Sequence, residues 1–256
     1  MDQRRVWITG ASSGIGSALA RHYAGQGATL ALVARRADAL QALARTLPGD
    51  HHCYALDVTD AAAIRQAASE FTTKSGLPDT VIANAGISAG TLTEEADDLA
   101  AFARIFAVNV QGMVNTFQPF VAPMRSRGSG RLAGIASVAG IRGLPGAGAY
   151  SASKAAVIAY LESLRVELHG SGVKVVTVAP GYIATPMTAV NRYPMPFLLA
   201  ADTAAPRMAR AIDRGTSYAV VPWQMGVAAK LLRLLPNALF DTIFFRAGRK
   251  PRGLDL

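Results

Sequence analysis

Residues 9–16, TGASSGIG, decide the fold, because they join a short apolar run at residues 6–8 to a helical pattern at residues 17–26. The glycines are Gly10, Gly14 and Gly16, a spacing that departs from the G-x-G-x-x-G of many dinucleotide sites. Glycine lets a backbone turn tightly and approach a phosphate, and the first turn of the following helix supplies N–H donors. This position favours a nucleotide cradle over an ordinary glycine-rich turn.

Outward from this turn, apolar runs alternate with helical patterns along the whole chain. Strands are predicted at residues 6–8, 29–34, 52–56, 80–83, 131–136, 174–178 and 218–221. Helices are predicted at 17–26, 37–46, 61–74, 96–124 (with an irregularity near Pro119) and 150–169. This alternation predicts an α/β fold, a Rossmann-like doubly wound parallel sheet of about seven strands with helices on both faces. Since no linker or repeat interrupts it, residues 1–256 are predicted to form a single domain.

Composition narrows the class of protein. The chain has 256 residues, of which 51% are hydrophobic and 17% charged, values that exclude a disordered chain. A single cysteine excludes an internal disulfide framework and favours a reducing, cytoplasmic location. The net charge of +9 suits a phosphate-bearing ligand, nucleic acid or an anionic membrane without choosing among them. No apolar run reaches the length of about 18 residues that a membrane span needs.

The end of the second predicted strand indicates which dinucleotide binds. The segment reads LALVARR, so Arg35 and Arg36 stand where NAD-binding proteins carry an acid for the ribose 2′-hydroxyl. A guanidinium group favours a 2′-phosphate by charge and by bidentate hydrogen bonding. The pair therefore predicts NADP(H) rather than NAD(H), with two solvated arginines as the alternative.

A second motif carries acid–base chemistry. Tyr150 and Lys154, in YSASK, are four residues apart on one predicted helix and so share a face. A nearby cation lowers the pKa of a phenol, which suits tyrosine as a general acid or base. Ser137 follows the fifth predicted strand, at the carboxyl edge of the sheet. Taken alone, a Tyr/Lys pair on a helix is more often a surface feature.

Together these motifs resemble the short-chain dehydrogenase/reductase family over residues 6–185. The resemblance implies that Asn109, Ser137, Tyr150 and Lys154 form a catalytic tetrad. It also implies a cofactor site at Gly10, Ser12, Ser13, Gly14, Ile15, Gly16, Arg35, Arg36, Asp57, Val58, Asn84, Ala85, Gly86, Tyr150, Lys154, Pro180, Gly181, Ile183 and Thr185. Within it, Asp57 is expected to contact the adenine, Thr185 the nicotinamide carboxamide, and Asn84–Gly86 to steady the sheet. Taken singly, Asp57 reads as a helix cap or turn residue, Asn84 as a turn residue and Asn109 as a satisfied polar contact.

The resemblance also implies a mechanism, the reduction of a ketone to an alcohol or the reverse oxidation. NADPH would supply the hydride, Tyr150 the proton, and Ser137 a hydrogen bond to the substrate oxygen. Lys154 would lower the pKa of Tyr150 and bind the nicotinamide ribose, and Asn109 would hold a water that continues a proton relay. The family further implies a small-molecule substrate and a homodimer or homotetramer. A non-catalytic NADP-sensing or scaffold protein on the same fold is the alternative function.

The segment near residues 182–205 is expected to form a substrate lid. It is unusually apolar at Met187, Tyr193, Met195, Phe197, Leu198 and Leu199. One hypothesis is a lid over a hydrophobic substrate, such as an acyl chain, a steroid or a bulky ketone. Ordinary core packing or an oligomer contact is an equal alternative.

A C-terminal extension near residues 224–256 carries two apolar helical stripes. The first is Met225, Ala228, Leu232 and Leu235, and the second is Leu239, Phe240, Ile243 and Phe244, with Arg246, Arg249, Lys250 and Arg252 beyond. Such an element suits the surface of a lipid bilayer. Packing over the substrate pocket or against another subunit is favoured, because an amphipathic stripe is ordinary for any surface helix.

The remaining charged and polar residues add no further chemistry. The four histidines show no ligand spacing, so no metal site is predicted. Ser13 in GASSG only faintly resembles a hydrolase nucleophile turn. The acidic run Glu94, Glu95, Asp97 and Asp98 is predicted to be a solvated helix start. The basic residues are dispersed except near the C-terminus, and no nucleic-acid-binding motif is present, so no nucleic-acid partner is predicted.

Overall fold

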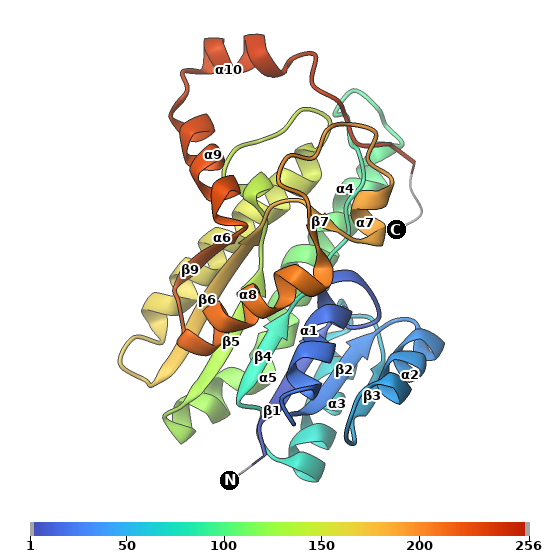
Figure 1. Ribbon diagram of the computed structural model, residues 1–256, viewed down its shortest axis with the longest axis vertical. Helices are drawn as coiled ribbons and strands as arrows, with labels where there is room; N and C mark the ends of the chain where they lie inside the picture. Colours follow the sequence, from blue (N-terminus) through green and yellow to red (C-terminus); the bar gives the residue numbers. More distant parts are fainter. Residues whose placement is uncertain (1–2, 254–256) are drawn as a thin grey trace.

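The computed structural model describes residues 3–253, whose centre is a seven-stranded parallel sheet (Figure 1). Its strands are β1 (Arg5–Thr9), β2 (Thr29–Ala34), β3 (His52–Ala55), β4 (Thr80–Ala83), β5 (Gly130–Ile135), β6 (Val173–Pro180) and β9 (Tyr218–Val221). They are ordered β3-β2-β1-β4-β5-β6-β9, and each neighbouring pair is parallel. The predicted doubly wound α/β fold is therefore confirmed.

Helices cover both faces of this sheet. One face carries α1 (Gly14–Ala24), α2 (Ala37–Thr46) and α8 (Ala201–Arg214), and the other carries α3 (Ala61–Ser75), α5 (Gly112–Arg127) and α6 (Gly148–Glu167). In β2, Leu30 and Leu32 belong to the core of the first face, whereas Ala31 and Val33 belong to the core of the second. Because both faces are buried, the strands read as continuous apolar runs rather than as alternating patterns.

The order of the strands creates the place for a ligand. The chain moves outward from β1 to β2 and β3, then returns to the other side of β1 to form β4. At such a reversal the connections after the two central strands diverge, and they leave a crevice at the carboxyl ends of the strands. The glycine turn after β1 and the segment after β4 border this crevice.

The single long helix predicted at 96–124 is wrong in detail. It consists of α4 (Asp98–Phe106), a π-helical segment (Ala107–Gln111) and α5. Pro119 lies inside α5 without ending it, so the irregularity is not at that residue. A π-helical turn inserts an extra residue into a helix, and such turns are frequent at functional sites. Here the π-helical segment contains Asn109, whose side chain is fully buried.

The C-terminal part contains elements that were not among the predicted strands, and its last two helices coincide with the two predicted apolar helical stripes. A second, two-stranded parallel sheet pairs β7 (Ile183–Ala184) with β8 (Leu199–Ala200), and α7 (Pro186–Ala189) lies between them. Helix α8 follows β8 directly. After β9 come α9 (Trp223–Leu234) and α10 (Asn237–Phe244), which lie at one end of the long axis of the molecule (Figure 1). Within residues 3–253, no helix is both long enough and apolar enough to cross a membrane.

Candidate functional site

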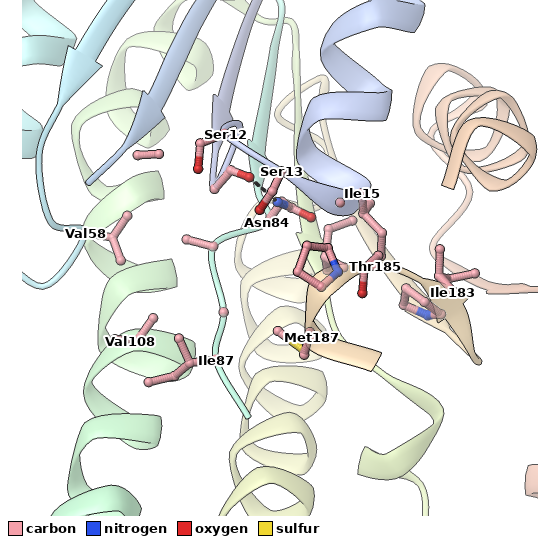
Figure 2. Close-up of a pocket in the computed structure, with 18 of the residues that line it drawn as sticks. Ser12, Ser13, Ile15, Val58, Asn84, Ile87, Val108, Ile183, Thr185 and Met187 are labelled. Atoms are coloured by element: carbon pink, nitrogen blue, oxygen red, sulfur yellow. Dashed lines mark hydrogen bonds between the residues drawn. The ribbon is translucent and has the colours of Figure 1, made fainter. Parts of the chain in front are cut away.

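A cavity of about 690 Å³ lies at the carboxyl ends of the central strands (Figure 2). Of the sequence-predicted site residues, all except Gly16 and Asn109 line it. Figure 2 shows Ser12 and Ser13 from the glycine turn at one side, with Thr185 and Met187 from the predicted lid facing the same space. The lining also includes residues that the sequence analysis did not name as site residues: Ala34, Leu56, Ile87, Val108, Ile135, Ala136, Pro186 and Thr188. Most of them are adjacent in sequence to a predicted site residue, and this adjacency could have been used to predict them.

The glycine turn is shaped for the close approach of a ligand. Gly10 has a φ of +67°, and a Cβ there would lie 2.8 Å from the Cα of Ala85. A Cβ on Gly16 would collide with the carbonyl oxygen of Gly10. Gly16 does not line the cavity. Because it has no side chain, the first turn of α1 can pack directly against the carbonyl of Gly10. Gly14 and Ile15, the first residues of α1, line the cavity, so the first turn of this helix can supply N–H donors to the diphosphate of a dinucleotide.

Asn84 fixes this turn from the neighbouring strand. Its side-chain amide donates to the carbonyl oxygens of Thr9 at 3.0 Å and Gly10 at 3.3 Å. In return, the hydroxyl oxygen of Thr9 accepts from the backbone amides of Asn84 at 3.1 Å and Ala85 at 3.2 Å. The asparagine therefore does more than build a local turn, since it joins the carboxyl ends of β1 and β4.

Two arginines border one end of the cavity. Arg35 and Arg36 are both exposed and line it, and a guanidinium nitrogen of Arg36 donates to the hydroxyl of Ser12 at 3.2 Å. Cations at this distance from the glycine turn fit a phosphate group. The residues that line the cavity therefore suit a dinucleotide.

Asp57 also lines the cavity, and its carboxylate is held by protein groups. It accepts from the amide and hydroxyl of Thr59 at 2.9 and 2.8 Å and pairs with Arg104 at 2.6 Å. Burial alone would raise the pKa of Asp57, but the hydrogen bonds from Thr59 and Arg104 outweigh this effect and lower the pKa. Arg104 comes from α4 and was missed, because no local pattern links it to Asp57.

Ser137, Tyr150 and Lys154 meet beside the central strands. The hydroxyl of Ser137 accepts from the amide of Ala139 at 3.1 Å and lies close enough to that of Tyr150 to affect its ionisation. The ammonium of Lys154 donates to the carbonyl of Ile135 at 2.8 Å and lies 5.9 Å from the centre of the Tyr150 ring. Asn109 lies behind them: it accepts from the amide of Ile87 at 2.8 Å and donates to its carbonyl at 3.1 Å.

The ionisation of this group differs from the expectation. Burial raises the pKa of Tyr150, and the nearby hydroxyl of Ser137 only partly opposes this effect. Burial lowers the pKa of Lys154 to about 8. The expected lowering of the Tyr150 pKa by Lys154 is therefore not seen, because the ammonium is directed to Ile135 and desolvation dominates both groups. Tyr150 is consequently protonated at neutral pH, the state in which a phenol can donate a proton.

The acidic run before α4 is solvated only in part: Glu94 and Asp97 are exposed as predicted, whereas Glu95 is half-buried and Asp98 is buried. The carboxylate of Asp98 accepts from the amide of Leu92 at 2.7 Å and from Arg252 at 2.7 Å. Arg252 also pairs with Glu95 at 2.8 Å. These hydrogen bonds, with that of Arg252 the largest, lower the pKa of Asp98. The carboxylates of Glu95 and Asp98 serve as an anchor for a segment far along the chain rather than as a solvent-facing helix start.

That segment, residues 246–252, is called the C-terminal strap here. In Figure 1 it runs from α10 back across the body toward α4 and α7. Lys250 is only 9% exposed, and its ammonium donates to the carbonyl of Met187 at 2.8 Å. Gly248 packs against Tyr193 of the predicted lid, and the amide of Gly90 donates to the carbonyl of Pro251 at 2.9 Å. The strap thus ties the lid to the segment that follows β4.

Comparisons with known proteins agree with this geometry. Residues 4–195 match the family model described as short chain dehydrogenase. An uncharacterized oxidoreductase of Myxococcus xanthus is 38% identical over 244 residues, which cover 94% of this chain and 96% of that protein. A 3-oxoacyl-(acyl-carrier-protein) reductase of Thermotoga maritima is 37% identical over 184 residues, 71% of this chain and 74% of that protein. Among solved structures, a 3-ketoacyl-(acyl-carrier-protein) reductase from Brucella melitensis complexed with NADH is similar, with a TM-score of 0.79 at 25% identity over 85% of this chain and 95% of that one.

Proposed function

The chain belongs to the short-chain dehydrogenase family, and on that premise we propose that it is an NADP(H)-dependent oxidoreductase that interconverts an apolar ketone and its alcohol. The observation that carries the proposal is that Ser137, Tyr150 and Lys154 line the same cavity as the glycine cradle, with the Lys154 ammonium 5.9 Å from the centre of the Tyr150 ring. The family acts on CH–OH groups, and the site offers a proton donor where such a group would lie.

Each of the four residues has a proposed part in the reaction. The nicotinamide, when bound, supplies the hydride. Tyr150 donates its hydroxyl proton to the substrate oxygen, and the hydroxyl of Ser137 donates a hydrogen bond that holds this oxygen in place. Lys154 holds its ammonium close to Tyr150, where a cation stabilises the phenolate left after proton transfer. Asn109 orients the segment after β4 through its two hydrogen bonds to Ile87, and we infer that it also positions the water that returns the proton.

The proposed preference for NADP(H) rests on Arg35 and Arg36. The solved reductase from Brucella melitensis holds NADH, which is a property of that protein. Here two exposed guanidinium groups border the cavity at the carboxyl end of β2. A charge-assisted hydrogen bond to a phosphate contributes about 1.5–3 kcal/mol, less where solvent screens it. We therefore expect each arginine to contribute about 1 kcal/mol to the preference.

Calorimetric titration of the wild-type protein with NADPH and NADH tests this proposal. NADPH is expected to bind at least tenfold more tightly, which corresponds to about 1.4 kcal/mol. Arg35→Ala and Arg36→Ala are each expected to reduce the difference without weakening NADH binding. Equal affinities in the wild-type protein would contradict the NADP(H) preference, and binding of neither dinucleotide would contradict the proposed cofactor site.

The apolar substrate is proposed from the lid and the strap. Met187 and Tyr193 are half-buried, and burial together with the nearby hydroxyls of Tyr182 and Tyr150 raises the pKa of Tyr193 to about 12. Met187 lines the cavity and Tyr193 packs against Gly248 of the strap, so we place both in the cover over the substrate. Catalytic efficiency is expected to rise with the chain length of a ketone series, and a flat or falling series would contradict an apolar substrate.

A homo-oligomer is proposed through α4 and α6, which pack against each other. Leu99 and Phe102 on α4 and Val166 on α6 are exposed large apolar side chains. Burying such side chains between copies of the chain is favourable, because apolar surface leaves water. Light scattering is expected to give the mass of a dimer or tetramer, and a monomer would contradict this part of the proposal.

A further inference from the structure

Helices α9 and α10 carry a row of large apolar side chains that the other residues between 3 and 253 leave uncovered. On α9, Trp223, Val227, Leu231 and Leu234 are 68%, 50%, 61% and 79% exposed. Their spacing of four, four and three residues places them on one side of the helix. On and just after α10, three more are exposed: Leu239, Ile243 and Phe245. These seven residues are called the outer apolar face.

The opposite side of α9 already has its partner. Met225 and Ala229 are buried, and Gly226 packs against the side chain of Val220 in β9. The apolar stripe predicted from the sequence, which begins at Met225, therefore faces the body of the protein. The outer apolar face is a second apolar side of the same helix. A helix that is apolar on both sides needs a partner on both. Within residues 3–253, that second partner is not part of the fold.

The turn between α9 and α10 holds the two helices as one unit. The guanidinium of Arg142 donates to the carbonyl oxygens of Leu232 and Leu235, the latter at 2.8 Å, and lies 3.8 Å from the centre of the Phe240 ring. In Figure 1 this unit forms the end of the molecule farthest from β1. The outer apolar face is therefore presented on a protruding end rather than within a groove.

The charges around this face identify its partner. Four exposed cations accompany it, Lys230, Arg233, Arg246 and Arg249, and Asp241 is the only acid between residues 223 and 252. In a two-fold dimer the same patch meets itself, so these cations would face their own copies. An anionic surface with an apolar interior matches both the cations and the apolar side chains.

We propose that the outer apolar face is an interfacial anchor that docks the enzyme on an anionic lipid bilayer. Helices α9 and α10 lie parallel to the bilayer, the seven apolar side chains enter the boundary between headgroups and acyl chains, and the four cations contact lipid phosphates. The strap continues directly from α10 to the lid, so docking brings the proposed substrate entrance close to the lipid. The proposal rests on surface contacts alone and does not depend on the reaction.

Intrinsic fluorescence provides a direct test, because the chain has two tryptophans and they report different places. Trp7 is fully buried among Tyr54, Phe71 and Phe120, whereas Trp223 belongs to the outer apolar face. With vesicles of equal parts phosphatidylglycerol and phosphatidylcholine, the emission of the wild-type protein is expected to shift to shorter wavelength and to become less sensitive to acrylamide. Trp223→Phe is expected to show no shift, since only Trp7 remains. A shift that persists in Trp223→Phe would overturn the proposal.

Flotation with the same vesicles tests the apolar contact by a second readout. Leu231→Glu is expected to lower the bound fraction at least tenfold, whereas Gln41→Glu, which adds the same charge at an exposed position of α2, is expected to bind like wild type. Vesicles of phosphatidylcholine alone are expected to bind much less protein, because the four cations lose their partners. Equal flotation of wild type and Leu231→Glu would overturn the proposal, and so would equal binding to both lipid compositions.

Two controls separate this proposal from its rivals. Circular dichroism and NADPH titration of Leu231→Glu are expected to match wild type, so a failure of docking is distinguishable from a failure of the proposed cofactor site. Light scattering without vesicles is expected to give the same mass for wild type and Leu231→Glu. A wild-type oligomer that Leu231→Glu dissociates, together with no flotation of wild type, would show that a second copy covers the face and would overturn lipid docking.

Discussion

A Lys250→Met substitution removes a buried cation from the C-terminal strap while keeping most of the side-chain volume. The ammonium of Lys250 donates to the carbonyl of Met187 at 2.8 Å. Burial lowers the pKa of Lys250 from 10.5 to about 8. The folded protein therefore holds this proton less tightly than the unfolded chain does.

The magnitude follows from two opposing effects. The lowered pKa means that the ammonium costs up to about 3 kcal/mol of folding free energy at neutral pH, at about 1.4 kcal/mol per pH unit, and less where solvent screens it. The pKa shift already includes the charged form of the hydrogen bond, and leaving the Met187 carbonyl without any donor costs about 1–3 kcal/mol in addition. Because these effects nearly cancel, the free energy of unfolding of Lys250→Met at pH 7 is expected to lie within about 1 kcal/mol of the wild-type value.

The dependence on pH distinguishes the two effects. Between pH 8 and 10.5 the unfolded wild-type chain binds more protons at this position than the folded protein, so the wild-type free energy of unfolding rises with pH. The variant lacks this contribution. The free energy of unfolding of wild type, relative to that of the variant, is therefore expected to increase by about 1–2 kcal/mol between pH 7 and about pH 9.5. The buried Lys154 is present in both proteins and cancels in the difference.

Urea denaturation of both proteins at the two pH values measures these differences. A loss of several kcal/mol in the variant at pH 7 would refute the reasoning, because it would mean that the cation stabilises the fold. The same difference at both pH values would refute it as well, because the ammonium would then have an ordinary pKa.

Three further predictions concern the site. Asn84→Ala leaves the carbonyls of Thr9 and Gly10 without their donor and is expected to lower the free energy of unfolding by about 1–3 kcal/mol; an unchanged urea midpoint would contradict this. Gly16→Ala introduces a Cβ that collides with the Gly10 carbonyl, so calorimetry is expected to find NADPH binding weakened at least tenfold; wild-type affinity would show that the cradle tolerates the methyl group. The kcat/KM for ketone reduction is expected to fall as pH rises through about 8, where Lys154 loses its proton, and a profile that stays flat to about pH 9.5 would exclude a part for this ammonium.

Much of the fold could be predicted because parallel strands leave a strong signal. Residues 29–34, 80–83 and 218–221 were predicted with the bounds that the structure gives, since strands buried on both faces are short apolar runs. The glycine turn could be located because three glycines, Gly10, Gly14 and Gly16, stand within seven residues between a predicted strand and a predicted helix, although the contacts of Gly10 with Ala85 could not be predicted. The parts assigned to Ser137, Tyr150, Lys154 and Asn109 in the reaction stay predictions, although three of the four residues line the cavity.

The features that could not be predicted depend on contacts between residues that are far apart in the sequence. Arg252 and Asp98 are 154 positions apart, and no local pattern indicates that Asp98 is buried and paired with the strap. Arg104 and Asp57 are 47 positions apart and pair only because α4 passes the end of β3. In the π-helical segment, the side chain of Asn109 is hydrogen-bonded to Ile87 and Ser153. Because both partners are distant in the sequence, helical periodicity could not reveal this segment.

The oxidation of NADPH by wild type and by Tyr150→Phe, in the presence of a bulky apolar ketone, tests the central claim most directly. Loss of the near-ultraviolet absorbance of NADPH reports turnover, and calorimetry confirms that both proteins bind NADPH. Wild type is expected to turn over, and Tyr150→Phe is expected to be at least about a hundredfold slower, the lower range for loss of a general acid. Equal rates in the two proteins would contradict the part given to Tyr150. Binding of NADPH without turnover of any ketone in a broad panel would contradict the enzyme itself and favour a non-catalytic NADP-sensing protein.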